Sequence, residues 1–412
     1  MRRKKWIRTV NLFCCLCIIT PMLTGCWDRL EIEERAVVLG VSIDSVKSDH
    51  SQEEEGEVSH LNNSIPAPNK SLIRVAVQIA LPGRIPLGPG ESGGGNGPAE
   101  KTVWVIDVVG HSIDDAFMNL QQQVSSRLFF GHLRVIVVSE SVAKKGLENI
   151  NDYFRRNPEV RRMAWMMISK GRAIRFMDAT PKLERVPTLY LMSTLDEGSR
   201  MGKFPKDYIG IFWSNLSKKG QEGFLPYVEL KKEQNIEIKG LAYFRGDHLV
   251  GITKPLEIAG YLGIKGVNPA GYRVFIQPGD ASTAIMTNTT HRKATTKVQI
   301  KDNVPHFTIT ISVELNIEEK LSENIQFNNP AILKQYEKKQ EEVSLKFYTD
   351  IIKKTQEKGS DIFGFGEYVR GKKPSFWNKN VKSAEGWQKM YKDSTFDIKV
   401  SMKLRRIGMK AK

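Results

Sequence analysis

The sequence predicts a mixed α/β (α+β) protein of several domains. Strand-like runs alternate with helical periods between residues 103 and 169, which gives the order β-α-β-α-β. A more broken, glycine-spaced stretch follows, and then strand-like runs surround one long helix. We therefore expect an N-terminal β-α-β-α-β domain over residues 26–185, a smaller middle domain over 186–285, and a C-terminal domain over 286–412 in which a sheet packs on the helix.

The first 25 residues have the order of a secretory signal. Five basic residues between Arg2 and Arg8 precede an apolar run from Leu12 to Leu23, and two small residues follow. The run is about a dozen residues long, shorter than the roughly 20 that span a bilayer. We predict a lipoprotein signal peptide over residues 1–25 that is removed. An uncleaved short anchor and an ordinary signal peptide with a chance cysteine are the alternatives.

Cys26 stands directly after the predicted cleavage point, in Leu23-Thr24-Gly25-Cys26. This segment resembles the lipobox of bacterial lipoproteins, in which the cysteine receives a diacylglycerol and becomes the new N-terminus. We predict that Cys26 becomes S-diacylglycerol cysteine and N-palmitoyl cysteine, because two or more acyl chains anchor a protein stably. The remaining cysteines are Cys14, Cys15 and Cys17, all inside the predicted signal peptide. The mature chain would then contain no disulfide, and its cores must stabilise it.

The chain is strongly basic, with 62 Lys and Arg against 46 Asp and Glu, a net charge of +16. The excess is concentrated at the C-terminal end, where residues 330–412 contain 20 basic and 10 acidic residues. An exported chain does not meet cytoplasmic DNA, which argues against a nucleic-acid partner. An anionic membrane surface, an acidic partner and a simply solvated face remain open.

The N-terminal domain is expected to begin with strands over residues 36–44, 71–80 and 103–109. Residues 71–80 alternate, with Ile73, Val75, Val77 and Ile79 on one face. The loops between these strands are predicted to be flexible, because one is acidic and the other is rich in Pro and Gly. They cover residues 47–70 and 82–100.

Helices then alternate with strands. Ser112 is predicted to cap a helix that runs to about Ser125. A strand over 133–138, a helix over 140–156 and a strand over 163–169 follow. This order implies at least partly parallel pairing with right-handed crossovers.

The middle domain is expected to contain strands over 224–230, 236–246 and 248–253, and the C-terminal domain strands over 294–300, 306–317 and 395–407. The long helix is predicted over 330–358, since Pro330 suits a first turn and Gly359 a helix stop. A three-four spacing predicts that one stripe of this helix packs and that its Lys-rich remainder faces solvent. The stripe consists of Leu333, Tyr336, Val343, Phe347 and Ile351.

Ser92 lies in Gly90-Glu91-Ser92-Gly93-Gly94, which fits the G-x-S-x-G pattern of hydrolases. That chemistry requires a strand directly before the serine and a helix directly after it, and neither is predicted here. We interpret the segment as a loop. It also contains no G-x-G-x-x-G that opens a helix and no G-K-[ST], so nucleotide binding is not predicted.

None of the seven histidines pairs with another at H-x-x-x-H spacing, so we predict no metal site. They are His50, His60, His111, His132, His248, His291 and His306. His132, at a strand entry, is interpreted as a hydrogen-bonded structural group rather than a base. Asp361–Gly366, "DIFGFG", is interpreted as a tight packed turn, with a ligand lid or a partner contact as alternatives. No catalytic or cofactor-binding residue is predicted.

Several segments, in order, resemble the Ger(x)C family of spore germination lipoproteins. They are "LTGCWDRLEIEERAVVLGVSID", "RLFFGHLRVIVVSE", "FLPYVEL", "IKGLAYFRGDHLVG", "DIFGFGEYVR", the tryptophans Trp377 and Trp387, and "KVSMKLRRIG". The resemblance implies three α/β-type domains, no cofactor and no known enzymatic activity. It also implies a C-type subunit of a nutrient germinant receptor, lipid-anchored at the spore inner membrane of an endospore-forming bacterium, beside integral-membrane A-type and B-type subunits. Only Cys26 carries over as a functional residue.

Two classes of function are therefore compared. The first is a lipid-anchored, non-catalytic subunit needed for assembly or signalling of the receptor. The alternative is an exported solute-binding lipoprotein or an extracytoplasmic hydrolase. A binding lipoprotein should close two lobes over a deep pocket, and a hydrolase should bring a serine and a histidine into contact.

Overall fold

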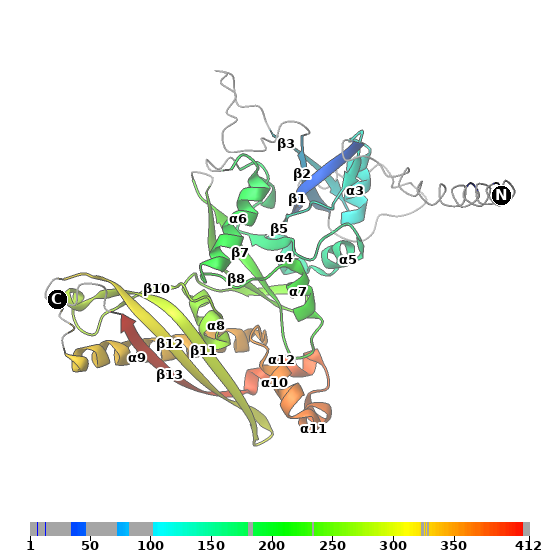
Figure 1. Cartoon of the computed structure of the whole chain (residues 1–412). Helices are drawn as coiled ribbons and strands as arrows, with labels where there is room; N and C mark the ends of the chain where they lie inside the picture. Colours follow the sequence, from blue (N-terminus) through cyan, green and yellow to red (C-terminus); the bar gives the residue numbers. More distant parts are fainter. Residues whose placement is uncertain are drawn as a thin grey trace.

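The computed structural model describes residues 34–46, 72–81, 102–179, 184–232, 235–322 and 329–406, with the single residues 6, 13, 325 and 327. Cys26, Ser92 and both predicted loops, 47–70 and 82–100, lie outside the described residues. The described elements form two sheets in two halves of the molecule (Figure 1). No helix of the described ranges is both long and apolar enough to cross a bilayer.

The first sheet has nine strands in the order β3-β2-β1-β5-β6-β7-β8-β9, with β4 paired beside β1. The central strands β1, β5, β6 and β7 are parallel, while β2 and β3 on one side and β8 and β9 on the other pair antiparallel. The strands are β1 Arg35–Ser45, β2 Ile73–Ala80, β3 Val103–Gly110, β4 Arg127–Phe129, β5 Val135–Ser139, β6 Trp165–Ser169, β7 Phe224–Leu230, β8 Ile236–Arg245 and β9 His248–Ile252.

The predicted parallel pairing is confirmed for β5 and β6. β3 runs in the same direction as β5 but does not neighbour it, because β2 and β1 lie between them. β1, β2 and β3 form an antiparallel meander that places β1 at the sheet centre. The chain therefore passes from β3 across β2 and β1 to reach β5, and β3 and β5 do not pair with each other.

Within the described ranges five α-helices accompany the first sheet, and successive residues of its central strands face two different cores. Ile136 and Val138 of β5 belong to one core, which α3, α4, α5 and α7 complete. Val135 and Val137 belong to the other, which α6 covers and which continues into the second half of the molecule. The helices are α3 Ile113–Gln121, α4 Glu140–Lys145, α5 Glu148–Arg156, α6 Pro187–Arg200 and α7 Ile209–Leu216.

The predicted cap at Ser112 is confirmed, since its hydroxyl accepts a hydrogen bond from the amide of Asp115 at 3.2 Å. The single helix predicted over 140–156 is wrong. The chain breaks at Gly146, which has φ 117°, and forms α4 and α5. Asp247, in the turn between β8 and β9, accepts from the amides of Leu147 and Glu148 at the start of α5. A contact from 100 positions away thus divides the helix.

The second sheet has the order β10-β11-β12-β13. β11 and β12 form a long hairpin, and Asp302 and Asn303 in its turn both have positive φ, the geometry of a tight two-residue turn. β13 pairs parallel to β12 at the sheet edge. The strands are β10 Arg273–Ile276, β11 Ile285–Lys301, β12 Val304–Lys320 and β13 Thr395–Arg406. The helices are α8 Glu257–Lys265, α9 Pro330–Lys358, α10 Phe365–Lys372, α11 Pro374–Phe376 and α12 Ala384–Asp393, with a π-helix over Trp377–Val381.

The predicted bounds of α9, 330–358, are confirmed, with Asn329 as its cap and Gly359 at φ 65° after its end. The predicted stripe is partly wrong, because Val343 is 51% exposed. Glu337 and Glu341 of α9 accept from the amides of Leu404 and Met402 on edge strand β13. These bonds fix the rotation of the helix. The side chains it buries are Tyr336, Gln340, Ser344, Tyr348, Ile351, Ile352 and Thr355.

The boundaries predicted near residues 185 and 285 stay predictions. Strand pairing crosses both of them. β6 pairs with β7 across the first, and β10 pairs with β11 across the second. Residues 186–285 therefore contribute β7, β8 and β9 to the first sheet and β10 to the second.

Candidate functional site

His132 is half-buried, and its ring packs edge-on to Phe129 with ring centroids 6.0 Å apart. Burial lowers the pKa of His132, and the nearby Arg134 and Arg161 lower it further. Within the described ranges no hydrogen bond to this ring is found, and the expected hydrogen bond stays a prediction. A neutral ring in this setting fits the structural interpretation. The described residues also bring no group of three His, Cys, Asp or Glu side chains together as a metal site.

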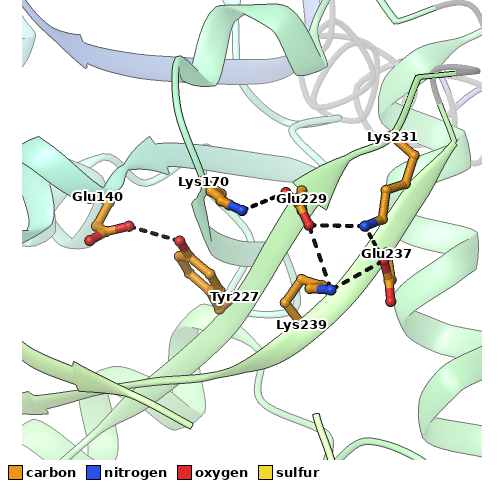
Figure 2. A network of polar contacts seen from close by, with 7 residues as sticks. All are labelled: Glu140, Lys170, Tyr227, Glu229, Lys231, Glu237 and Lys239. Carbon is orange, nitrogen blue, oxygen red and sulfur yellow. Dashed lines mark hydrogen bonds and ion pairs between the residues drawn. The ribbon is translucent and has the colours of Figure 1, made fainter. Parts of the chain in front are cut away.

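Charged side chains gather near the carboxyl ends of β5 and β6 and across β7 and β8 (Figure 2). Glu229 accepts from Lys170 at 2.7 Å and from Lys231 at 3.1 Å, and Lys231 also pairs with Glu237 at 2.7 Å. The hydrogen bonds from Lys170 and Lys231 lower the pKa of the partly buried Glu229 to about 2. A carboxylate held ionised by lysines is a poor proton donor or acceptor near neutral pH. We interpret this network as an ion-paired surface that links β6, β7 and β8.

The Asp361–Gly366 segment is a packed turn, as its sequence predicts. The buried carboxylate of Asp361 accepts from the amides of Phe363, Gly364 and Gly366 at 2.8–3.1 Å. It also accepts from the indole of Trp387 on α12 at 3.0 Å. These four bonds close the turn between α9 and α10.

The turn carries two aromatic rings into the core between the sheets. Phe363 stacks on Tyr261 of α8 with ring centroids 5.6 Å apart. Phe365 packs at 5.0 Å against Phe307 of β12 and at 4.9 Å against Phe396 of β13. One short segment therefore contacts both α8 and the second sheet.

The same turn docks on the first half of the molecule. We call the contact between residues 220–222 and residues 360–367 the joint. The amide of Glu222 donates to the carbonyl of Asp361 at 2.9 Å, and Gly220 and Glu367 exchange two hydrogen bonds at 2.9 and 3.2 Å. Beside the joint, the Ser360 hydroxyl donates to the carbonyl of Phe244 on β8.

The joint contains two buried carboxyl groups, those of Glu222 and Asp361, and the charge of Asp361 acts on Glu222. Glu222 is 6% exposed and accepts from the amide of Gly246 at 2.8 Å and from Gln388 of α12 at 2.7 Å. Burial and, to a smaller extent, the nearby Asp361 raise the pKa of Glu222 to about 7. Burial also raises the pKa of Asp361, to about 6. Perturbed carboxyl groups mark candidate functional sites as well as structural ones.

Sequence reasoning found the turn but missed Glu222. The one local sign is an acidic residue that stands, with Gly223 between, just before the apolar run "FLPYVEL". Its partners Gly246, Asp361 and Gln388 are distant in the sequence, so no spacing connects them. The joint exists only once the two halves are packed.

Comparisons with known proteins match the two halves separately. Residues 28–230 match the family model described as spore germination protein N-terminal domain. Residues 239–408 match the model described as spore germination B3/GerAC like, C-terminal.

Curated relatives match over nearly the whole chain. The putative spore germination protein YfkR of Bacillus subtilis (strain 168) is 26% identical over 392 residues, which cover 91% of each chain. Spore germination protein KC of the same strain is 24% identical over 413 residues, covering 94% of this chain and 93% of the relative. The crystal structure of the GerBC protein has the same fold, with a TM-score of 0.55 and 18% identity over 82% of this chain and 96% of that one.

Proposed function

The chain belongs to the Ger(x)C family of spore germination proteins, and from this premise we propose that it is the lipid-anchored, non-catalytic C subunit of a spore germinant receptor. Nutrient-triggered germination would require it through assembly with membrane-embedded A-type and B-type subunits. The observation that carries the proposal is that both family models match in order, from residue 28 onward, two positions after the cysteine of Leu23-Thr24-Gly25-Cys26.

The lipid anchor would act by raising the local concentration of the protein at the membrane. An acylated Cys26 confines the protein to the membrane surface, which raises its effective concentration near other membrane-bound subunits without any new contact. The extracytoplasmic face of the spore inner membrane is the location that this arrangement requires. The basic excess of residues 330–412 could then orient the C-terminal half toward lipid headgroups or an acidic partner.

The joint supports a role in assembly or signal transmission. Its hydrogen bonds connect the segment before β7 to α10, and the Asp361 carboxylate connects the same turn to α12. A force or a contact on one half would therefore be passed to the other through buried, bonded groups rather than through a free linker.

The test replaces the chromosomal gene with Cys26→Ala and Cys26→Ser variants and compares them with a deletion strain. In detergent-phase partitioning, we expect both variant proteins to move from the detergent phase to the aqueous phase. We expect both variant strains to lose nutrient-triggered germination, as the deletion strain does. Cys17→Ala is the matched control, since this cysteine would leave with the signal peptide, and it should behave as wild type. Mass spectrometry of the native N-terminus should show fatty acyl groups on Cys26.

Two results would contradict the proposal. One is an unacylated N-terminus in the mature protein. The other is a normal response of the deletion strain to every nutrient tested, which would return attention to an exported solute-binding lipoprotein or an extracytoplasmic hydrolase.

A further inference from the structure

A cavity of about 410 Å³ lies in the C-terminal half, between α8, α9 and strands of the second sheet. Its walls are mostly apolar, and Leu256, Phe275 and Val343 are exposed where they line it. We take these three side chains as its rim. A volume of this size is within the usual range for small-molecule sites in proteins.

Arg292 of β11 lines the cavity and is only 3% exposed. The β11–β12 register shifts between Thr289 and His291, so Thr290 and His291 both face solvent and Arg292 returns to the inner face of the sheet. A bulge of this kind redirects the side chain that follows it. Asn268 fixes the position by bonding both the amide and the carbonyl of Arg292, at 3.0 and 2.7 Å.

The positive charge of the Arg292 guanidinium group is poorly compensated. The group donates one long hydrogen bond, of 3.3 Å, to the carbonyl of Val267, and among the described residues it forms no ion pair. No Asp or Glu lines the cavity within that part of the chain. A buried charge without a counter-charge costs several kcal/mol, so an anion in the cavity would be bound favourably.

Other polar groups line the same cavity. Thr289 and Ser344 are buried in the cavity wall, and Gln340 donates to Ser344 at 3.1 Å. The rings of Tyr272 and Tyr348 also line the cavity. The combination is an apolar chamber with one buried cation, Arg292, a second and exposed arginine, Arg273, and a few hydrogen-bonding groups.

We propose that this cavity binds a small organic acid, with its carboxylate on Arg292 and its apolar body between α8 and α9. The planar guanidinium fork suits a carboxylate, to which it can donate two parallel hydrogen bonds. The apolar body would contact Phe347 and the rim. The inference does not depend on the lipid anchor or on receptor assembly.

The test uses 4-phenylbutyrate and octanoate as probes, with 4-phenylbutyramide and octanamide as uncharged counterparts. Binding to the full chain in phosphatidylcholine nanodiscs is measured by calorimetry, and empty nanodiscs give the background from partitioning into lipid. We expect at least one carboxylate to bind with a Kd below about 1 mM and about tenfold or more tightly than its amide.

Two variants locate the site. Arg292→Gln should weaken carboxylate binding about tenfold and leave amide binding unchanged. Val343→Trp, at an exposed rim position, should fill the entrance and abolish binding of both classes. Leu345→Trp is the matched control, because Leu345 is also exposed on α9 but does not line the cavity, and it should bind as wild type.

The proposal is overturned if neither carboxylate binds below about 1 mM, or if acid and amide bind wild type equally. Equal binding by wild type and Val343→Trp would also overturn it. The Val343 variant and the acid–amide comparison keep the test decisive if Arg292→Gln does not fold.

Discussion

Gly220 and Gly366 meet backbone to backbone at the joint. A Cβ placed on Gly220 would lie 2.4 Å from the carbonyl carbon of Gly366, and one on Gly366 would lie 2.6 Å from the Cα of Gly220. Neither position has room for a methyl group. The adjacent Glu367 accepts from the amide of Gly220 and donates to its carbonyl, so the close approach is also hydrogen-bonded.

Gly220→Ala should therefore destabilise the protein by about 1–3 kcal/mol, because the added methyl group must push the joint apart. Denaturant unfolding measures the change. Gly371→Ala is the matched control, since a Cβ there meets nothing within 4 Å and the residue lies in α10. The control should be neutral or slightly stabilising. If the two variants lose the same stability, the close contact at the joint does not matter energetically.

Asp361→Asn should be strongly destabilising. Both carboxylate oxygens accept hydrogen bonds, and an amide group in place of one of them would face donors instead of accepting from them. Leaving buried donors unpaired costs about 1–3 kcal/mol each, so we expect a loss of about 2 kcal/mol or more.

Thermal unfolding of the Asp361 variant should show this loss, together with altered fluorescence of Trp387, which donates to the same carboxylate. Asp397→Asn, on an exposed position of β13, is the control and should change little. An unchanged melting curve for Asp361→Asn would mean that the turn is closed by its aromatic packing alone.

Elements whose signals are local were predictable from the sequence. Pro330 and Gly359 gave both ends of α9, Ser112 gave the cap of α3, and the interleaved glycines and phenylalanines of Asp361–Gly366 gave a packed turn. Each depends on backbone geometry or hydrogen bonding within a few residues, which the residue types themselves report.

Features set by distant contacts were not predictable. Gly146 interrupts the helical pattern of residues 140–156, and Asp247, from a distant turn, accepts the hydrogen bonds that hold the break. The rotation of α9 follows from the unpaired edge of β13, which Glu337 and Glu341 satisfy, rather than from the spacing of apolar residues. Glu222 likewise acquires its burial only when the halves pack, and Arg292 only when the second sheet packs against α8 and α9, so composition could not single them out.

The raised pKa of Glu222 predicts that stability depends on pH. The carboxyl group titrates at about 7 in the folded state, well above its ordinary value near 4.5. Between these values the folded protein holds a proton that the unfolded chain has lost, so the free energy of unfolding falls as pH rises through this window. Asp361, with its pKa raised to about 6, contributes in the same direction at lower pH.

Glu222→Gln should remove the larger part of this dependence. Its amide oxygen can still accept from Gly246, and Gln388 can turn its own amide to accept from the new side chain. We expect the variant to equal wild type near pH 5 and to exceed it at pH 8 by at most about 3 kcal/mol, measured by urea unfolding at both values. Glu342→Gln, exposed on α9, should track wild type at both. A Glu222 variant less stable than wild type at pH 8 would show that this carboxylate is ionised in the joint and stabilises it there. The charge of Arg245, which lowers the pKa of Glu222, would be the partner that does so.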